Sequence, residues 1–494
     1  MTQLCETVTA GTTAGLIAAR NKSTADLVEL RLDGAGELDV AGVLAGRTRP
    51  VVVTCRPRWE GGQFDGSEEE RHAILGRALE LGAEFVDLEW RARFDDLVRR
   101  DPARVVLSSH DFEGVPADLA ARARAMRATG AGTIKVAVTP GRLSDTLPLI
   151  DVASGGPAVV VGMGDAGVAT RLLAAHFGSR WTYAGQAVAP GQIPLRRMVE
   201  EFRFRAVHPG TAVFGVVSRT AMQSLSPAMH NAALAASGID AVYVPLAAAD
   251  FTDFQSFSVR LGVIGVSVTI PFKLDALAAA SSADAIAVSA GAANTLRRDS
   301  RGGWEATNTD VDGFLAPLAT MFASLRGVRA AVLGAGGAAR AAIVALRTRG
   351  ALVTVHARRM EQADEVACDL GVRSAAWPPA PGSWDLLVNA TPLGSASHHQ
   401  ESPLPGGPFD GRLAYDLTYA PGESRFLAEA RQAGCATLDG LPMLVAQAER
   451  QFEWWQGRPA PPGVMRAAVE KRAADAGQAM QRPAGAVATD RAGE

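Results

Sequence analysis

Cysteine is scarce in this chain of 494 residues, which contains only four. They are Cys5, Cys55, Cys368 and Cys435, and none of them forms a Cys-x-x-Cys pair with another. Isolated cysteines of this kind provide neither a zinc site nor a disulfide framework, so we expect reduced thiols and no metal centre.

The chain also lacks an excess of charge and long apolar runs. Its formal net charge is −3, which provides no positive surface for nucleic acid or an anionic membrane. No apolar run approaches the roughly 18 residues that span a bilayer, and the N-terminus lacks the basic and apolar regions of a signal peptide. We therefore expect a cytoplasmic protein whose partners are small molecules; the sequence makes no prediction of its oligomeric state.

The residues that are present are typical of a globular α/β protein with more than one domain. Apolar residues make up 48% of the chain and charged residues 20%. In the first 205 residues, short apolar runs alternate with Ala- and Arg-rich segments of helical character. This alternation predicts a TIM-type (β/α)8 barrel over residues 1–207. The predicted strands are Leu4–Val8, Leu27–Asp33, Val51–Arg56, Phe85–Trp90, Val105–His110, Thr133–Val138, Ala158–Met163 and Trp181–Gly185.

A stretch that contains Pro and Gly, Phe204-Arg-Ala-Val-His-Pro-Gly210, separates the barrel from a second α/β domain, which we expect over residues 210–475. Strand and helix patterns alternate over a substrate subdomain of about 210–320. A strand that leads into a Gly-rich loop then predicts a Rossmann subdomain over about 326–440, followed by helices that return to the substrate subdomain. The Ala-, Gly- and Arg-rich tail, 477–494, is expected to be disordered.

Charged side chains interrupt the apolar runs of the first half, mostly near the C-terminal ends of the predicted strands. Glu29 and Arg31 have the same parity in Leu-Val-Glu-Leu-Arg, so both project toward the barrel interior. One such residue is most simply a structural ion pair, but a whole set needs partners and a reason, because buried charge is costly. Catalytic groups of these barrels lie at the same strand ends, so an active site is predicted here. The remaining members of the set are Arg56, Glu89, His110, Lys135 and Arg171.

Lys135 is the most informative of these residues. It lies in Thr-Ile-Lys-Val-Ala-Val, among aliphatic side chains that should desolvate its amine. A neutral amine attacks a ketone and forms a Schiff base, and the resulting iminium acidifies the adjacent carbon. His110 would then move the proton, with Glu60 or Glu89 as candidates to orient its ring. The set predicts elimination of water from a β-hydroxy ketone, with arginines as ligands of a carboxylate or of hydroxyls.

In order along the first 200 residues, several segments resemble type I 3-dehydroquinate dehydratase. The segments are Glu29-Leu-Arg-Leu-Asp33, Thr54-Cys-Arg-Pro-Arg-Trp-Glu-Gly-Gly62, Asp87-Leu-Glu89, Ser108-Ser-His-Asp-Phe112, Lys135-Val-Ala-Val-Thr-Pro140 and Ala189-Pro-Gly-Gln192. The resemblance implies that Lys135 forms the Schiff base and that His110 is the acid and base. It implies that Glu60 orients His110, with Glu89 in support. The substrate contacts that it implies are Glu29, Arg31, Arg56, Arg171 and Gln192. Val188 stands where the family often has a serine on the closing loop, so a hydroxyl contact is missing there.

In the second half, a Gly-rich segment follows a predicted strand and opens a helix. Gly334-Ala-Gly-Gly-Ala-Ala-Arg340 allows backbone N–H groups to approach a pyrophosphate at the helix N-terminus. The next strand, Val353–His356, is followed by Ala357-Arg358-Arg359 and not by the carboxylate that an NAD site usually carries. Unless both arginines are merely solvated, they favour the 2′-phosphate of NADP(H).

Polar residues follow apolar or small-residue strands upstream of this loop, as they would in a pocket for a polyhydroxylated ring. Lys273 and Asp310 could act as an acid/base pair that protonates a carbonyl oxygen as hydride arrives. Ser224 and Ser226 could line the same pocket, although a serine directly before Pro227 is also a typical helix N-cap.

These segments together resemble shikimate dehydrogenase, over about residues 210–472. They are Ser224-Leu-Ser226, Thr269-Ile-Pro-Phe-Lys273, Gly334-Ala-Gly-Gly-Ala338, Asn389-Ala-Thr-Pro392, Asp416–Tyr419 and Gly440-Leu-Pro-Met-Leu-Val-Ala-Gln447. The resemblance makes Lys273 and Asp310 the catalytic dyad and the two serines ligands of the substrate carboxylate. The ring hydroxyls would be held by Thr269, Asn294, Tyr419 and Gln447. The cofactor would be bound by Gly334, Ala335, Gly336, Gly337, Ala338, Arg358, Arg359, Asn389, Thr391 and Gly440.

The two reactions are consecutive, because the first yields the substrate of the second, and the order of domains resembles the bifunctional enzyme of plants. One alternative is a fusion of quinate metabolism that uses NAD; Ser224 and the arginines at 358 and 359 argue against it. Another is a non-catalytic regulator of the quinate-repressor kind. The presence of Lys135, His110, Lys273 and Asp310 together argues against a regulator.

Overall fold

A computed structural model describes residues 2–185, 190–395, 398–419 and 422–481. By its internal contacts the chain divides into two compact units. The first comprises Met1–Pro227 with Asp240–Ile264, and the second comprises Ala228–Ile239 with Gly265–Glu494. Among the helices in the described ranges, none combines the length and the apolar character that crossing a membrane requires.

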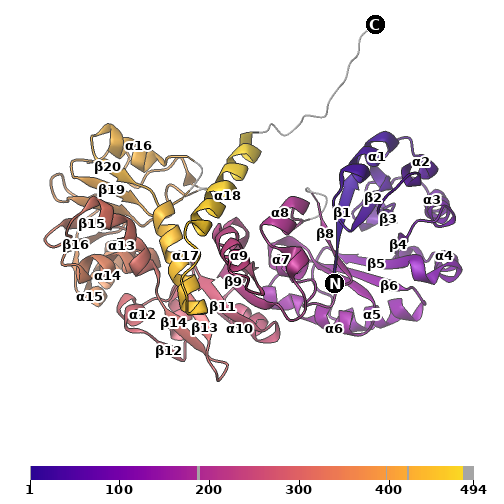
Figure 1. Ribbon diagram of the computed structural model, residues 1–494, viewed down its shortest axis with the longest axis horizontal. Helices are drawn as coiled ribbons and strands as arrows, with labels where there is room; N and C mark the ends of the chain where they lie inside the picture. Colours follow the sequence, from indigo (N-terminus) through magenta and orange to yellow (C-terminus); the bar gives the residue numbers. More distant parts are fainter. Residues whose placement is uncertain (1, 186–189, 396–397, 420–421, 482–494) are drawn as a thin grey trace, which may run out of the picture. The chain divides into compact units, whose positions relative to one another are not determined.

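Eight parallel strands form the barrel of the first unit, in the order β7-β6-β5-β4-β3-β2-β1-β8 (Figure 1). They are β1 (Gln3–Thr9), β2 (Leu27–Arg31), β3 (Val51–Thr54), β4 (Phe85–Glu89), β5 (Val105–Asp111), β6 (Thr133–Val138), β7 (Ala158–Gly162) and β8 (Trp181–Ala184). At the closure, the backbone N–H of Arg180 before β8 donates to the carbonyl of Ala158 in β7, at 2.9 Å. Every predicted strand of this half is present, and the (β/α)8 prediction is confirmed.

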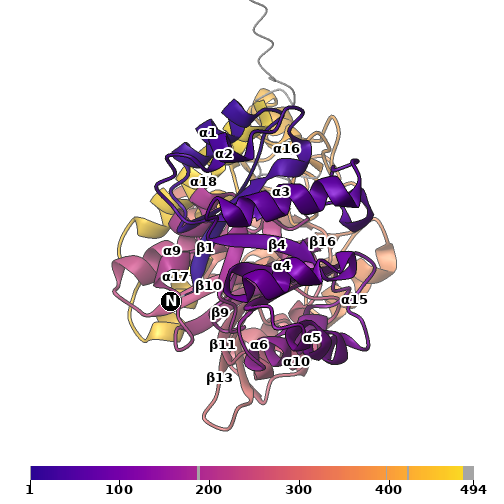
Figure 2. The same cartoon turned by 90° about the vertical axis from the view of Figure 1, so that its right-hand side faces the viewer.

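Helices lie outside the barrel strands, as Figure 2 shows for α1 to α6. They are α1 (Thr13–Lys22), α2 (Val40–Leu44), α3 (Glu68–Glu80), α4 (Asp95–Arg100), α5 (Leu119–Ala128), α6 (Pro148–Ser154), α7 (Gly164–Leu172) and α8 (Leu195–Glu200). Helix α3 begins with a capping box, in which Ser67 and Glu70 each bond the backbone N–H of the other. The strands are buried almost throughout because helices cover their outer face and side chains fill the interior.

The register of the strands aligns chemistry-bearing residues across the barrel. Glu89 of β4 is level with Ser108 of β5, and Ser108 is level with Lys135 of β6. Thr7 of β1 is level with Glu29 of β2. Because parallel strands present their C-terminal ends at one rim, this register brings together side chains from strands far apart in the sequence.

After the barrel, the first unit adds β9 (Ala212–Ser218), β10 (Ala241–Ala247) and α10 (Phe251–Arg260), and β9 pairs with β10 in parallel. In the second unit, β11 (Val263–Val268) pairs antiparallel with β13 (Thr295–Arg298), which pairs antiparallel with β14 (Trp304–Thr307). Strand β12 (Ser282–Ala283) pairs with β14 in parallel. The helices of this region are α9 (Ser226–Ala236), α11 (Lys273–Ala278), α12 (Ala285–Ala290) and α13 (Asp310–Met321).

A second parallel sheet, in the order β17-β16-β15-β18-β19-β20, forms the Rossmann subdomain. Its strands are β15 (Arg329–Leu333), β16 (Leu352–His356), β17 (Arg373–Ser374), β18 (Leu386–Asn389), β19 (Leu413–Asp416) and β20 (Ala436–Leu438). Its helices are α14 (Gly337–Thr348), α15 (Met360–Leu370) and α16 (Arg425–Gln432). From β15, the chain adds β16 and β17 on one side of the sheet and then β18, β19 and β20 on the other side. The Gly-rich loop after β15 therefore lies at the switch point of the sheet. The predicted Rossmann subdomain is confirmed.

Two C-terminal helices complete the chain, α17 (Leu441–Gln456) and α18 (Val464–Gln481). Helix α18 extends five residues into the segment that was predicted to be disordered from 477. Its Ala-rich sequence favours a helix, and the disorder prediction gave this propensity too little weight. Residues 482–494 of that segment lie outside the described residues.

Candidate active sites

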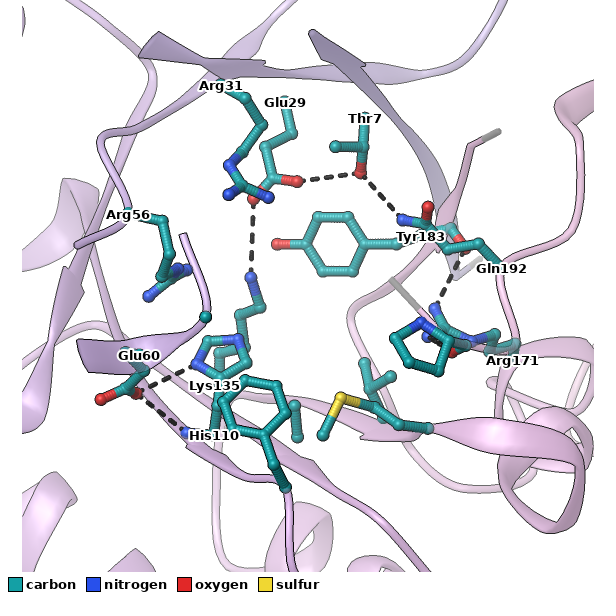
Figure 3. A pocket seen from close by; sticks show the side chains of 16 residues that line it. Thr7, Glu29, Arg31, Arg56, Glu60, His110, Lys135, Arg171, Tyr183 and Gln192 are labelled. Atoms are coloured by element: carbon teal, nitrogen blue, oxygen red, sulfur yellow. Dashed lines mark hydrogen bonds and ion pairs between the residues drawn. The ribbon is translucent and has the colours of Figure 1, made fainter. Parts of the chain in front are cut away.

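Lys135 lies inside the barrel, where carboxylates and an aromatic ring surround its amine. Its Nζ is 3.0 Å from Oδ2 of Asp87 and 3.5 Å from Oε1 of Glu29, and it lies 4.4 Å from the centre of the Tyr183 ring (Figure 3). The side chain is buried. The sequence predicted aliphatic neighbours and nearby arginines for this amine, but it did not predict these carboxylates, which β2 and β4 direct to the same point.

Asp87 is the centre of this charge cluster. Its Oδ1 accepts from Arg56 at 2.9 Å and from the hydroxyl of Ser108 at 2.6 Å, while Oδ2 accepts from Lys135. Burial would raise the pKa of Asp87, but the positive charges of Arg56 and Lys135 outweigh burial and hold the pKa below its usual range. Asp87 is therefore an anion that holds the lysine in place.

His110, at the end of β5, is bonded to Glu60. One oxygen, Oε1 of Glu60, accepts from the backbone N of His110 at 2.9 Å and pairs with the ring Nδ1 at 3.0 Å. Burial, together with the positive charges of Arg56 and Lys135, lowers the pKa of His110 well below its usual range. Burial raises the pKa of Glu60 to about 7 against the opposing charge of Arg56. A neutral imidazole with Nδ1 engaged leaves Nε2 as its proton acceptor.

Of the two candidates for orienting His110, the structure pairs Glu60 with the ring. Glu89 instead accepts from Arg56 at 2.6 Å and forms a close ion pair with Arg71 of α3. Burial raises the pKa of Glu89, and so does the neighbouring charge of Asp87, while Arg56 and Arg71 oppose the shift. Glu89 is not one of the residues that line the cavity, but it supports Arg56, which does.

The arginines of the predicted set differ in their partners. Arg56 forms ion pairs with both Asp87 and Glu89. Arg31 forms a bidentate ion pair with Asp33, in which both hydrogen bonds are 2.8 Å long. Arg171 is buried, and it makes long contacts to the backbone carbonyls of Tyr183 and Pro190 at 3.4 and 3.3 Å. Among the described residues no carboxylate pairs with it, and its Nε has no partner. Burial lowers the pKa of Arg171 to about 10. It is a cation without an anion, which suits a substrate carboxylate.

One cavity brings together every residue predicted for the first site except Glu89 (Figure 3). Thr7 joins them: its hydroxyl donates to Glu29 at 2.9 Å and accepts from Gln192 at 3.4 Å. Val188, the departure on the closing loop, lies outside the described residues. The predicted residues that line the cavity are Glu29, Arg31, Arg56, Glu60, His110, Lys135, Arg171 and Gln192.

In the second unit, Lys273 and Asp310 form the predicted dyad. Lys273 begins α11 and Asp310 begins α13, and Nζ is 2.5 Å from Oδ2. Asn294, just before β13, donates from Nδ2 to Oδ1 of Asp310 at 2.8 Å. Its Oδ1 accepts from the backbone N of Thr309 at 2.8 Å and from the hydroxyl of Thr295 at 2.7 Å. These bonds fix the amide so that its NH₂ group faces the dyad.

This arrangement continues through buried side chains to α17. Gln451 donates from Nε2 to Oγ1 of Thr295 at 3.0 Å and to the carbonyl of Asn294 at 3.3 Å. Its Oε1 accepts from Ser267 at 2.7 Å and lies 3.2 Å from the ring of His230. Gln451 was not predicted as a site residue, and it holds the segment that orients Asn294.

The Gly-rich loop is shaped for close backbone approach. Gly334 has φ +114, and a Cβ there would lie 2.9 Å from the carbonyl oxygen of Ala390. A Cβ on Gly337 would lie 2.9 Å from Cδ of Lys273, whereas one on Gly336 would meet nothing within 4 Å. Helix α14 begins without a side-chain cap, so its first N–H groups are available to a phosphate. Ala335 and Ala338 belong to the same turn.

Other predicted cofactor residues lie at the C-terminal ends of the Rossmann strands. Arg358 and Arg359 are exposed after β16. Asn389 donates to Asp416 at 2.9 Å and accepts from the hydroxyl of Thr391 at 2.7 Å, which ties the ends of β18 and β19 together. Gly440 precedes α17, where a Cβ would lie 2.5 Å from the carbonyl of Thr418. This close approach requires glycine at position 440.

The remaining predicted substrate residues lie in loops and in α17. Oγ of Ser224 accepts from the backbone N of Ser226 at 3.2 Å, and Ser226 is the first residue of α9. Gln447 is buried in α17 and donates to the carbonyl of Leu444 at 2.8 Å. Thr269 is half-buried after β11, and Tyr419 is exposed.

The sequence reasoning missed several residues of the first site. Asp87 shares the parity of Glu89 in Phe-Val-Asp-Leu-Glu, the same signal that indicated Glu29 and Arg31. Tyr183 lies within a predicted strand and carries no charge to mark it. Arg71 comes from a helix, where no strand parity could indicate that it reaches Glu89.

Comparisons with known proteins agree with both halves. The family model "Type I 3-dehydroquinase" matches residues 4–209. The model "Shikimate dehydrogenase substrate binding domain" matches 216–296, and "Shikimate 5'-dehydrogenase C-terminal domain" matches 440–470.

Among similar proteins is the bifunctional 3-dehydroquinate dehydratase/shikimate dehydrogenase of Arabidopsis thaliana, described as chloroplastic. It is 31% identical over 475 residues, which are 88% of this chain and 78% of that protein. A shikimate dehydrogenase (NADP(+)) of Synechocystis is 38% identical over 276 residues, 52% of this chain and 95% of that protein. A solved shikimate dehydrogenase in complex with NADP+ is 28% identical, with a TM-score of 0.50 over 54% of this chain and 97% of its own.

Proposed function

Because the chain belongs to the family of bifunctional 3-dehydroquinate dehydratase/shikimate dehydrogenases, we propose that it performs two consecutive steps of the shikimate pathway. The barrel removes water from 3-dehydroquinate, and the second domain reduces the product, 3-dehydroshikimate, to shikimate with NADPH. The observation that carries the first step is Lys135, a buried amine bonded to Asp87 and facing a cavity with His110 and Arg171.

In the barrel, the substrate carboxylate pairs with Arg171, which places the ketone near Lys135. Nζ of Lys135 adds to the carbonyl carbon, and loss of one water leaves an iminium. Nε2 of His110 then takes a proton from the adjacent carbon while Glu60 holds Nδ1. The hydroxyl on the next carbon leaves as water with the proton returned by His110. A further water hydrolyses the iminium and frees Lys135, so the net change is the loss of one water.

In the second domain, Lys273 gives a proton to the carbonyl oxygen of 3-dehydroshikimate, and Asp310 holds its amine. Asn294 donates a hydrogen bond to the carboxylate of Asp310 and so holds Asp310 in position beside Lys273. The Gly-rich loop and the N-terminus of α14 fit a pyrophosphate, and the exposed Arg358 and Arg359 fit a 2′-phosphate. NADPH, when bound there, supplies the hydride.

We also propose the domain limits expected from the sequence, 1–207 and 210–475. The family matches support them, since one ends at 209 and the next begins at 216. A cytoplasmic location is part of the same proposal, and its support is that all four cysteines are unpaired.

The decisive assay supplies 3-dehydroquinate and NADPH and follows the loss of nicotinamide absorbance. We expect turnover by the native chain and none by Lys135→Ala or Lys273→Ala. The two variants should fail at different steps: Lys135→Ala still reduces added 3-dehydroshikimate, and Lys273→Ala still dehydrates 3-dehydroquinate. Turnover of quinate with NAD in preference to shikimate with NADP would favour the quinate alternative, and inactivity in both halves would favour a regulator.

Borohydride trapping tests the Schiff base directly. The lysines of the chain are Lys22, Lys135, Lys273 and Lys471, so a reduced adduct is easily assigned by peptide mass. Lys22 is an exposed residue of α1, and Lys22→Ala is the matched control that should still be trapped. Undiminished dehydration with an unmodified Lys135 would contradict the proposal.

A further inference from the structure

In the barrel cavity, the proton of one tyrosine hydroxyl has no acceptor among the described residues. Tyr183 of β8 lines the cavity, and its side chain is buried, with 4% exposed. Among the residues that the structure describes, no group accepts a hydrogen bond from its Oη. Buried polar groups are nearly always paired, because leaving one unpaired is costly. A hydroxyl without an acceptor in a binding cavity therefore indicates that a bound molecule supplies the missing hydrogen-bond acceptor.

The ring of Tyr183 lies beside the reactive amine. Nζ of Lys135 is 4.4 Å from the ring centre, and in Figure 3 the hydroxyl end of the ring points toward the space between Glu29 and Lys135. Burial raises the pKa of Tyr183 well above its usual range, and the charges of Glu29 and Asp87 add to this effect. The hydroxyl is consequently a neutral phenol that retains its proton for donation.

The nearest structural alternative is Trp181, two residues earlier on the same face of β8. Its indole N–H approaches the Tyr183 hydroxyl as a hydrogen-bond donor, and this contact lowers the pKa of Tyr183 against the larger effect of burial. An indole N–H only donates, so it can approach the phenol oxygen but cannot accept the phenol proton. In the described part of the chain, that proton still lacks an acceptor.

We propose that Tyr183 is a further substrate-binding residue of the dehydration site, whose hydroxyl donates to an oxygen of the hydroxylated cyclic ketone held at Lys135. The inference rests on the proposed dehydration. A substrate carbon bonded to Nζ lies next to the Tyr183 ring, so the oxygens on neighbouring carbons are the acceptors that binding brings to Oη. The polar groups already in the cavity, such as Glu29 and Gln192, are engaged with Thr7.

The test is Tyr183→Phe, which removes only the hydroxyl. Loss of a substrate hydrogen bond predicts a fall of roughly tenfold in kcat/KM for dehydration of 3-dehydroquinate, chiefly through a higher KM. Removal of an unpaired buried hydroxyl predicts an unchanged or higher Tm. A structural hydrogen bond would give the opposite pair of results, a lower Tm with unchanged kinetics.

The matched control is Tyr415→Phe. Tyr415 of β19 is also buried with an unpaired Oη, but it lies in the Rossmann subdomain, stacked on Phe314. We expect an unchanged or higher Tm and unaltered dehydration.

Lack of dehydration by the native chain would overturn the proposed function. Given an active native chain, a fall in kcat/KM of Tyr183→Phe with an undiminished Tm supports the inference. Any other combination overturns it and leaves the proposed function intact.

Discussion

A single oxygen of Glu60 accepts a hydrogen bond from the backbone N of His110 at 2.9 Å and pairs with ring Nδ1 of the same residue at 3.0 Å. This arrangement couples the tautomer of the histidine to the charge of the carboxyl. When Glu60 is ionised, Nδ1 carries the proton and Nε2 is free to accept one. When Glu60 is protonated, it can donate to Nδ1, and Nε2 then loses its role as a base.

Dehydration should therefore depend on pH through Glu60. Burial raises the pKa of Glu60 to about 7, while His110, with its lowered pKa, is already neutral in that range. As pH rises through about 7, Glu60 ionises and kcat/KM for dehydration should rise to a plateau. Glu60→Gln keeps an accepting oxygen but cannot titrate, so this step should vanish and the plateau should fall by about tenfold. A pH profile of the variant that retains the same step would assign it to another group.

Replacement by methionine should weaken substrate binding at Arg171 and destabilise the fold at Arg56. Arg171 has no described carboxylate partner, so Arg171→Met should raise KM for 3-dehydroquinate by about a hundredfold with no loss of Tm. Arg56 compensates Asp87 and Glu89, so Arg56→Met should destabilise the fold by about 3–5 kcal/mol. Thermal denaturation and steady-state kinetics of both variants check this contrast. A comparable loss of Tm in Arg171→Met would show that its charge is balanced within the free protein.

The hydrogen bond from Thr295 to Asn294 should matter for reduction and not for dehydration. Thr295→Val keeps the shape of the side chain but removes the hydroxyl that donates to Oδ1 of Asn294 at 2.7 Å. With the amide less firmly oriented, kcat for reduction of 3-dehydroshikimate should fall by about tenfold. Ser267→Ala removes instead the hydroxyl that donates to Oε1 of Gln451 at 2.7 Å, one residue further from Asn294, so its kcat should stay within about twofold. Equal losses in both variants would mean general loosening of α17.

Cofactor choice should depend on the arginines after β16. Arg358 and Arg359 are exposed, and no carboxylate is recorded as their partner in the described part of the chain. Replacing both by alanine should raise KM for NADPH by about tenfold to a hundredfold, because each guanidinium is expected to pair with the 2′-phosphate. KM for NADH, which lacks that phosphate, should change little. A matching rise for NADH would instead indicate a role in binding the adenosine.

Much of the fold was predictable because its signals are local. Each barrel strand is a short apolar run, and each lies where its run predicted, since strands covered by helices must be apolar on both faces. The Gly-rich turn after β15 was also predictable from the sequence, because only glycine fits there. Gly334 has a φ of +114, and the carbonyl of Ala390 lies too close for a side chain. The end of α18 was misjudged because composition suggested disorder where local helix propensity prevails.

The candidate sites were predictable only in part. Sequence parity indicated that Glu29 and Arg31 face inward, and motif order indicated Lys135, His110, Lys273 and Asp310. The chemistry of the residues left Glu60 and Glu89 open as the partner of His110, and the resemblance implied Glu60. The structure pairs Glu60 with the ring and Glu89 with Arg56.

By itself, then, the sequence determined the identity of the strands, the Gly-rich turn and the reactive side chains, since each depends on residues adjacent in the chain. Tertiary structure alone decided the pairings. Asp87 and Glu29 meet Lys135, no carboxylate of the described residues pairs with Arg171, and Gln451 reaches Asn294 from 157 residues away. The physical reason is that the energy of a buried charge or hydrogen bond depends on distances of a few ångströms, which are set by barrel register and helix packing and by no local pattern.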